Sequence, residues 1–439
     1  MDHTPNPDLN PNNIPIYHSS LSYDPSTDLK VITIGDPHFK VNNIHESKAM
    51  TENLVSMVKQ MKPDIIVCLG DILDRHETIH VTPLTLAIEF LEKLKNIAPL
   101  YVIIGNHDRP NNSDFMSDMH PFNALKLWDN TTVIDSVYKE TFKGKYEFIF
   151  MPYVYPGRFL EGISHLPVER GDDVDKDKPN VRSAHCVFGH QEFFGAKMGA
   201  IVSQMGDKWP HDYPLVISGH IHDYGRPQFN IVYTGTPMQH AFGDHNSKTV
   251  SEFIFYPNME KRKMDVTLND SSENANESNS TSLVDHNVNS QKFPVVNNAW
   301  SDVGWAENRL DLGLMKRVIC RIHPNQISTW VPPENKLVKL VIKGTNAEIK
   351  GISGLDRLKE LKALGIKIDF KTVDDGYDPT TEEKSSGPQM PYLRSLELAT
   401  NVEPGVKKWF HTIFGSTEPI SADFIKESND SVQINLSDD

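Results

Sequence analysis

The chain has 439 residues, a formal net charge of −15 and a hydrophobic content of 38%, which is low for a chain that is globular throughout. Its length allows one large domain and a smaller one, and we expect part of it to be tail or linker. The negative charge argues against a general nucleic-acid coat, and three cysteines without paired spacing argue against a disulfide scaffold or a cysteine-built zinc site.

The first 27 residues are predicted to be an N-terminal extension. They contain neither a basic start nor an apolar stretch, so we expect no signal peptide. No apolar run in the chain approaches the roughly 20 residues that span a bilayer. We therefore expect a soluble, intracellular protein, in the cytoplasm, nucleoid or nucleus, with no membrane partner.

Three apolar runs then alternate with two helical patterns. The runs cover residues 30–34, 64–69 and 100–104, and the helical patterns extend from Met50 to Met61 and from Leu84 to Leu91. Thr82 is the expected N-cap of the second helix. Strand, helix, strand, helix, strand predicts an α/β fold with a largely parallel sheet and right-handed crossovers.

Polar side chains follow each predicted strand at its carboxyl end. Asp36, Asp71 and Asn106 come 35 residues apart, and the later apolar runs 185–189 and 214–219 lead to further histidines. In open α/β sheets, ligands bind just beyond the carboxyl ends of the strands, so we expect these side chains to meet. The full set is Asp36, His38, Asp71, Asn106, His190, His220 and His222.

This set combines carboxylate, amide and imidazole donors and contains no thiolate, which suits manganese, iron or zinc. Seven side chains are too many for one closed tetrahedral zinc site. They fit two metals that share a bridging carboxylate. Two metals roughly 3.5–4 Å apart can clamp the attacking and leaving oxygens of an in-line displacement at phosphorus.

Five ordered blocks resemble the calcineurin-like metallophosphoesterase family: GDPH (35–38), GDILDR (70–75), GNHD (105–108), GH (189–190) and GHIH (219–222). The resemblance covers residues 28–256 and implies a two-sheet αββα sandwich. It implies that Asp36, His38 and His222 hold one metal, that Asn106, His190 and His220 hold the other, and that Asp71 bridges them. It also implies that His107 is a general acid or charge stabiliser beside the leaving group, oriented by Asp108.

The family includes phosphomonoesterases, cyclic-nucleotide phosphodiesterases and nucleases. Segments 148–158 and 190–200 are similar to those of SbcD-type DNA repair and recombination nucleases. This second resemblance implies DNA as substrate and two divalent metals, with manganese preferred and iron or zinc also compatible. The alternatives are a phosphoesterase acting on a small molecule or phosphoprotein, and a metal-retaining scaffold in a repair complex.

Two further residues are candidates for substrate binding. Arg75 stands where many protein phosphatases have an arginine that contacts phosphate, and His76 stands where those phosphatases usually have glycine. A polar loop position is the alternative for His76.

The second half divides into a flexible linker or insertion (257–305), a capping domain (306–380) and a C-terminal segment (381–439). We predict a β-α-β capping domain with strands at 337–345 and 366–373 and a helix over 355–364 with Ser353 as its cap. From Lys336 to Lys371 it has nine basic and four acidic residues. Such clusters bind phosphate backbones, although many lysine runs only solvate a surface. In SbcD-type nucleases this domain holds DNA.

The C-terminal segment contains an aromatic stripe at residues 404–415 that suits an amphipathic helix. It predicts either a groove-binding helix or a helix that packs on its own chain. SbcD-type nucleases use such a segment to bind an SbcC-like, SMC-type ATPase, which we expect as a partner, with a second copy of this chain as a further candidate. The asparagine-rich composition is compatible with an AT-rich viral or phage genome.

Overall fold

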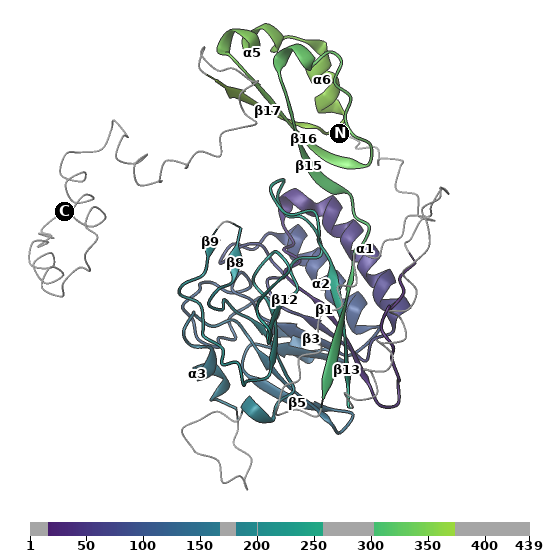
Figure 1. Cartoon of the computed structure of the whole chain (residues 1–439), viewed down its shortest axis with the longest axis vertical. Coiled ribbons are helices and arrows are strands. Elements are labelled where there is room, and N and C mark those ends of the chain that lie inside the picture. Colours follow the sequence, from purple (N-terminus) through teal and green to yellow (C-terminus); the bar gives the residue numbers. More distant parts are fainter. Residues whose placement is uncertain (1–15, 167–180, 200, 258–302, 374–439) are drawn as a thin grey trace, which may run out of the picture. The chain divides into compact units, whose positions relative to one another are not determined.

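The computed structural model describes residues 16–166, 181–199, 201–257 and 303–373 (Figure 1). The chain divides into two compact units, residues 1–371 and 372–439, and the elements below belong to the first, apart from the last residue of β17. Most of the predicted linker and all of the segment 381–439 lie outside the described residues. Among those described, no helix is both long and apolar enough to cross a bilayer.

The first sheet has six strands in the order β14-β13-β1-β2-β3-β4. Strands β1 to β4 pair in parallel, and β13 and β14 add two antiparallel strands beside β1. The strands and connecting helices are β1 (Leu29–Ile34), α1 (Ile44–Met61), β2 (Ile65–Cys68), α2 (Val81–Lys95), β3 (Leu100–Ile103), β4 (Thr131–Ile134), β13 (Val250–Tyr256) and β14 (Gly304–Leu310). The predicted β-α-β-α-β start is confirmed.

A second six-stranded sheet has the order β11-β12-β10-β7-β6-β5. Its central strands are parallel and both edge strands are antiparallel. The strands are β5 (Tyr138–Phe142), β6 (Tyr146–Met151), β7 (Cys186–His190), β10 (Leu215–Gly219), β11 (Gly225–Gln228) and β12 (Ile231–Tyr233). The predicted strands before His190 and His220 therefore belong to this sheet, while those before Asp36, Asp71 and Asn106 belong to the first.

The two sheets pack face to face around one buried apolar layer. Side chains of β1 and β3, such as Val31 and Tyr101, meet side chains of β6 and β7, such as Phe150 and Phe188. The ring of Tyr101 stacks on that of Phe150 at 4.6 Å. Burying large aromatic side chains between two sheets is a main source of the stability of such a sandwich.

The outer faces of the sandwich are covered differently. Helices α1 and α2 pack on the first sheet through residues such as Leu54 and Phe90 (Figure 1). The second sheet is covered by the five-residue helix α3 (Phe159–Ile163) and by loop residues Phe193 and Trp209. The architecture is consistent with the predicted αββα sandwich, although the second helical layer is short in the described residues.

Helix α2 begins two residues earlier than we predicted. Its N-cap is His80, which has extended backbone and no capping side-chain hydrogen bond, so the prediction of Thr82 as cap is wrong. Pro83 occupies the first turn, where the missing N–H costs nothing because that turn has no intrahelical acceptor.

A smaller, three-stranded sheet follows in the order β15-β16-β17, with β15 and β16 parallel. Its elements are β15 (Lys316–Ile322), β16 (Lys336–Gly344), α5 (Asn346–Ile352), α6 (Asp356–Ala363) and β17 (Lys367–Thr372). The predicted single helix is replaced by two, because Thr345 caps α5 through a bond from Glu348 N–H, and Ser353 ends α5 rather than starting α6. Strand β15 had no counterpart in our sequence prediction.

Short elements complete the described chain. They are η1 (Val41–Asn43), η2 (Asn123–Leu127), η3 (Val181–Ser183), η4 (Pro324–Gln326) and the hairpin β8 (Lys197–Met198) with β9 (Ile201–Val202). All three cysteines are free.

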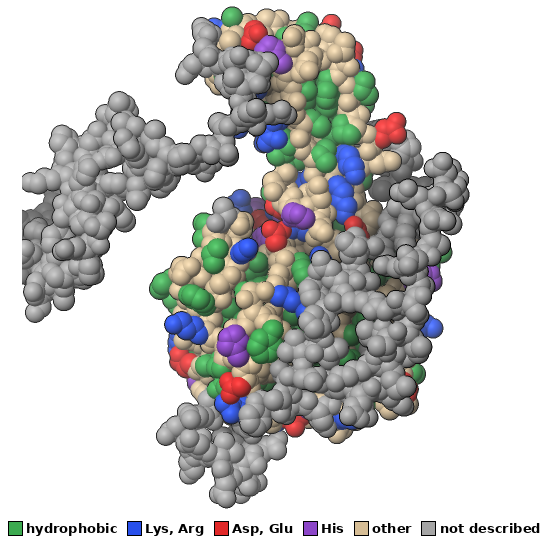
Figure 2. Space-filling view, in the orientation of Figure 1, with side chains coloured by type: hydrophobic (Ala, Val, Ile, Leu, Met, Phe, Trp, Pro, Cys, Tyr) green, Lys and Arg blue, Asp and Glu red, His purple; other side chains and the backbone are tan. Residues whose placement is uncertain are grey.

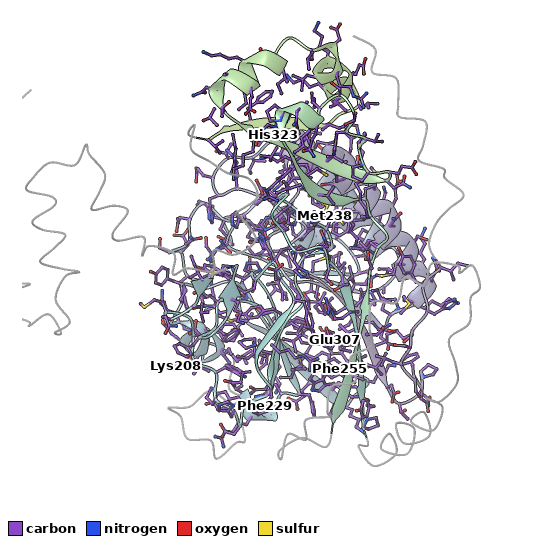
Figure 3. The ribbon with its side chains drawn as sticks, turned by 45° about the horizontal axis from the view of Figure 1, so that its top comes forward. Lys208, Phe229, Met238, Phe255, Glu307 and His323 are labelled. Carbon is purple, nitrogen blue, oxygen red and sulfur yellow. The ribbon has the colours of Figure 1, made fainter. Side chains whose placement is uncertain are left out.

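Strand β14 crosses the boundary that we predicted between linker and capping domain, at residues 305 and 306. It pairs with β13 along its whole length, so it is part of the first sheet. Glu307 of β14 lies close to Phe255 of β13 in Figure 3 and accepts hydrogen bonds from Tyr224 and Arg226, at 2.9 and 2.8 Å. Because Arg226 belongs to β11, this carboxylate ties the edges of the two large sheets together.

Candidate metal centre

The carboxyl ends of five strands, three from the first sheet and two from the second, bring the predicted ligands together. Four of these ligands have positive φ angles: Asp36 (38°), His38 (44°), Asp71 (48°) and His220 (80°). Residues other than glycine rarely adopt this left-handed backbone conformation. Where they do, they are concentrated at functional sites, because the surrounding fold imposes the strain there. The strand ends are therefore shaped around the site.

One group of donor atoms forms around His190. Its Nε2 lies 3.0 Å from Asn106 Oδ1 and 3.3 Å from Asp71 Oδ1. His220 Nδ1 lies 3.0 Å from Asn106 Oδ1 and 3.3 Å from His190 Nε2. His190 Nδ1 donates to the carbonyl oxygen of Leu69 at 2.7 Å, which leaves Nε2 as the ligand atom. These four side chains are those that the resemblance assigns to the second metal and its bridge.

A second group forms around His38. Its Nε2 lies 3.0 Å from His222 Nε2 and 3.8 Å from Asp71 Oδ2, while Nδ1 donates to Leu73 O at 3.0 Å. Asp36, His38 and Asp71 can offer three ligand atoms within 4.8 Å of one another, as can Asp71, His190 and His220. Asp71 thus directs one oxygen to each group, the geometry that a bridging carboxylate requires.

The electrostatics of the cluster favour a bound cation. Burial raises the pKa of Asp36 to about 8 and that of Asp108 to about 6. Burial also opposes the charge on Asp71, but His190 and other imidazoles outweigh it and hold the pKa of Asp71 well below its usual value. Buried carboxylates need a compensating positive charge, and a divalent ion supplies it.

The histidines fit the same conclusion. Burial lowers the pKa of His38 and His220 to about 3, so both are neutral, as ligands must be. Burial disfavours the charge on His190 too, but Asp71 and Asp36 raise its pKa to about 9. A metal bound between these carboxylates would take the place of that proton. The donor set present in the chain therefore fits a pair of divalent metals.

His107 lies beside the cluster and is not part of it. Its Nδ1 donates to Asp74 O at 2.7 Å, and its Nε2 lies 3.9 Å from Asp71 Oδ2 with a third of the side chain exposed. The resemblance implied that Asp108 orients this ring. The Asp108 carboxylate instead accepts the N–H groups of Ile72, Leu73 and Gly105. Asp108 thus supports the loop after β2, and Asp74 holds His107.

The two substrate-binding candidates lie in different places. His76 stacks on His107, with ring centroids 4.7 Å apart and an interplanar angle of 17°, and its Nδ1 donates to Arg109 O at 3.3 Å. Arg75 is exposed and lines a neighbouring cavity, outside the donor groups. His76 therefore lies next to His107, whereas Arg75 lies outside the contacts that define the two donor groups.

Three residues of the site escaped the sequence prediction. His240 donates from Nε2 to Asp36 O at 3.0 Å, and Glu192 Oε2 lies 4.0 Å from His220 Nε2. The Arg109 guanidinium is buried, has no hydrogen-bond partner among the described residues and lies 5.2 Å from the Tyr153 ring. Arg109 and Glu192 lie within two residues of a motif block and could have been considered, but nothing in the sequence spacing points to His240.

A profile described as calcineurin-like phosphoesterase matches residues 29–258, more than half of the chain. The chain belongs to this family. Two viral relatives share its sequence: "Putative phosphoesterase 078R" of Invertebrate iridescent virus 3 is 43% identical over 233 residues, and "Putative phosphoesterase 244L" of Invertebrate iridescent virus 6 is 44% identical over 247 residues. The matches cover 53% and 54% of this chain, and 64% and 82% of those relatives.

Two solved structures are similar to this chain at much lower sequence identity. A dimetal phosphatase from Danio rerio is 11% identical, with 52% of this chain and 94% of that one covered and a TM-score of 0.34. The phosphoesterase Yfce from E. coli is 12% identical, with 52% and 92% covered and a TM-score of 0.26.

As a calcineurin-like phosphoesterase, this protein is a metal-dependent hydrolase of phosphate esters. When bound, two divalent ions supply an activated water and neutralise charge on the phosphoryl oxygens. The chain itself contributes the orientation of the ligands, through the carbonyl oxygens of Leu69 and Leu73. It also holds His107 beside the donor groups, through the carbonyl oxygen of Asp74, with Nε2 3.9 Å from Asp71 Oδ2.

Proposed function

We propose that this phosphoesterase hydrolyses the phosphodiester bonds of DNA, in the manner of the SbcD-type nucleases that segments 148–158 and 190–200 resemble. Manganese is the proposed metal, and iron and zinc are the alternatives. The observation that carries the proposal is a basic face on the three-stranded sheet, next to a loop of the metal centre.

This basic face follows from strand alternation. Val318, Leu340 and Ile368 belong to the apolar layer under α5 and α6, so their chain neighbours point to the opposite side of the sheet. The basic residues on that side are Arg317, Arg321, Lys339, Lys343, Lys367 and Lys371. One acidic residue, Asp369, accompanies them and pairs with Lys339 at 2.6 Å. Lys and Arg side chains (blue) and hydrophobic ones (green) are both visible on this domain in Figure 2.

The basic face adjoins the loop that follows β12. The backbone N–H of Arg317 donates to Gln239 Oε1 at 2.6 Å, and the Arg317 guanidinium donates to Glu46 Oε1 at 2.8 Å. The Arg317 guanidinium and Lys367 Nζ lie 5.5 and 5.6 Å from the Phe242 ring. His240 of the same loop is bonded to Asp36 O. A phosphate chain held on this face would thus lie near the metal centre, as hydrolysis of a polymer requires.

The deciding assay offers the purified protein several phosphate esters in the presence of Mn²⁺. The substrates are labelled duplex DNA, single-stranded DNA, cyclic nucleotides and a generic phosphomonoester. We expect metal-dependent cleavage of DNA, abolished by a chelator. Cleavage of the small esters with no cleavage of either DNA would instead favour the small-molecule or phosphoprotein alternative. No cleavage of any substrate by metal-loaded protein would favour a scaffold.

Charge reversal tests the basic face directly. We expect Lys367→Glu with Lys371→Glu to lower the salt dependence of DNA binding by about two units of the logarithmic slope, because two phosphate contacts are lost. Lys359→Glu with Lys362→Glu is the matched control. Both residues belong to the basic segment from Lys336 to Lys371 that the sequence suggested for DNA binding, but they lie on α6, on the other side of the sheet. Equal effects of the two pairs would contradict the proposed face.

We further propose that residues 404–415 bind an SbcC-like, SMC-type ATPase. These residues lie outside the described part of the chain, and the proposal rests on their aromatic stripe. Truncation after residue 400 should leave cleavage of single-stranded DNA intact and remove ATP-stimulated cleavage of duplex ends. Loss of metal binding in the truncated protein would mean that the stripe packs on its own chain. A homodimer stays a proposal that sedimentation can test.

A further inference from the structure

A cavity of about 340 Å³ opens beside the metal centre, between the loops that follow β1 and β2. This volume is at the lower end of the roughly 300–1,000 Å³ of small-molecule sites. The lining residues are Phe39, Lys40, Val41, Asn42, Leu73, Asp74, Arg75, Thr78, Ile79, His80 and Pro83. None of them is a predicted metal ligand, so the cavity is separate from the donor groups.

The cavity and the metal centre share a wall. Phe39 follows His38 in the chain and forms an isolated parallel β-bridge with Leu73. The carbonyl oxygen of Leu73 accepts the hydrogen bond from His38 Nδ1. Asp74, also in the wall, holds His107 Nδ1 through its carbonyl oxygen. The cavity therefore lies beside His38, through its chain neighbour Phe39, and beside His107, through Asp74, to which the ring of His107 is hydrogen-bonded.

The lining combines an apolar interior with charges. Phe39 and Leu73 are almost fully buried, while the apolar side chains of Val41 and Ile79 are 58% and 49% exposed. Lys40 is paired with Asp74 at 3.2 Å, and the exposed Arg75 has no ion pair shown with any described carboxylate. An apolar slot with cations suits a flat ring that is linked to a phosphate, and a nucleobase, which can lay its face against apolar side chains, is such a ring.

We propose that this cavity binds the nucleoside next to the phosphate that is hydrolysed, on the side of His107. The base lies against the exposed side chains of Val41 and Ile79, over a floor that Phe39 and Leu73 form, and Arg75 contacts the following phosphate. This inference rests on the proposed function, because a nucleoside is a part of DNA. The basic face on the small sheet favours a nucleic acid over a phosphorylated protein side chain as the occupant.

Filling the cavity tests the inference. Val41→Trp places an indole in the slot, and Val331→Trp, at an exposed valine that does not line the cavity, is the matched control. The two substrates are the methyl esters of thymidine 5′-phosphate and of methyl phosphate, and the release of thymidine from the first is compared with the release of methanol from the second. We expect Val41→Trp to lower the ratio of kcat/KM for the thymidine ester to that for the ester of methyl phosphate by at least about fivefold, the lower range of one base-stacking contact. Val331→Trp should leave this ratio unchanged.

A binding measurement without metal separates this inference from the proposed function. Thymidine monophosphate is titrated into metal-free wild-type, Val41→Trp and Ile79→Glu proteins and followed by NMR. Weaker binding to both variants supports the cavity, and this result stands even if the wild-type protein cuts no DNA. The inference would be overturned if thymidine monophosphate bound equally to all three proteins, or if the kcat/KM ratio were unchanged in Val41→Trp. It would also be overturned if the wild-type protein bound phosphotyrosine more tightly than thymidine monophosphate. Each of these results would count even if DNA is cleaved.

Discussion

Gly105→Ala should disturb both metal positions at once. Gly105 packs directly against Asp71, and a Cβ atom added to it would lie 2.3 Å from both the backbone nitrogen and Oδ1 of Asp71. Ordinary contacts of a Cβ begin at 3.4 Å, so Asp71 or the loop of Gly105 must move by about 1 Å. Neither atom belongs to a flexible side-chain end that could turn away, since Asp71 Oδ1 also accepts the N–H of His107.

The size of the effect follows from this displacement. Overpacking a filled site costs about 1–3 kcal/mol of folding stability. A misplacement of about 1 Å in a catalytic group can lower the rate roughly 100-fold. Because Asp71 turns one oxygen to the His38 group and the other to the His190 group, the affinities for both metals should fall together.

The measurement is metal content per chain after dialysis against a series of free Mn²⁺ concentrations, together with hydrolysis of a p-nitrophenyl phosphate ester. Gly225→Ala is the control, since a Cβ at Gly225 would meet nothing within 4 Å and Gly225 lies in the same domain. We expect the control to bind two metals normally. If Gly105→Ala retained one metal at wild-type affinity and lost only the other, Asp71 would not be shared and the bridging role would be refuted.

Three further outcomes are expected. His107→Ala should bind two metals and lose nearly all turnover, because His107 is held by Asp74 O outside the donor groups; loss of a metal in elemental analysis would contradict this. Removing the metals with a chelator should lower the melting temperature, since saturation at about 100 times Kd contributes roughly 2.7 kcal/mol; an unchanged transition would speak against a high-affinity site. Phe150→Ala should cost about 3–5 kcal/mol in urea unfolding, because its fully buried ring stacks on Tyr101 and Phe188; a loss below 1 kcal/mol would mean that the layer between the sheets closes around the gap.

The first half of the fold and the donor set could be predicted because their signals are local. Apolar runs that end in Asp36, Asp71 and Asn106 identify parallel strands, and the carboxyl ends of neighbouring parallel strands must meet. The strands that precede His190 and His220 pair with each other in a second sheet, and this pairing depends on long-range contacts. The residues alone could not provide this, and only the family resemblance implied two sheets.

Other features were missed for different reasons. Thr345 and Glu348 form a capping box that the sequence displays, so helix α5 could have been predicted from it. The contact of His240 with Asp36 and the burial of the Arg109 guanidinium depend on how loops fold back on the strands. No local pattern specifies these features. His240 and Asp36 are far apart in the chain, and the Arg109 guanidinium has no hydrogen-bond partner among the described residues that a pattern could include.

The place of β14 has a consequence for how this protein folds as it is synthesised. All residues of strand β13 are buried in the finished sheet, and the strand is complete once Tyr256 has been added. Its outer neighbour, β14, is complete only at Leu310. At about 5–20 residues per second, the ribosome needs roughly 3–11 s to add the intervening residues. During that interval the N–H and C=O groups along one side of β13 lack their partner strand, and such an open edge can pair with other chains. The nascent chain therefore still carries this open edge after the whole family segment has been made, and residues 29–258 expressed alone would lack β14 as the partner of β13.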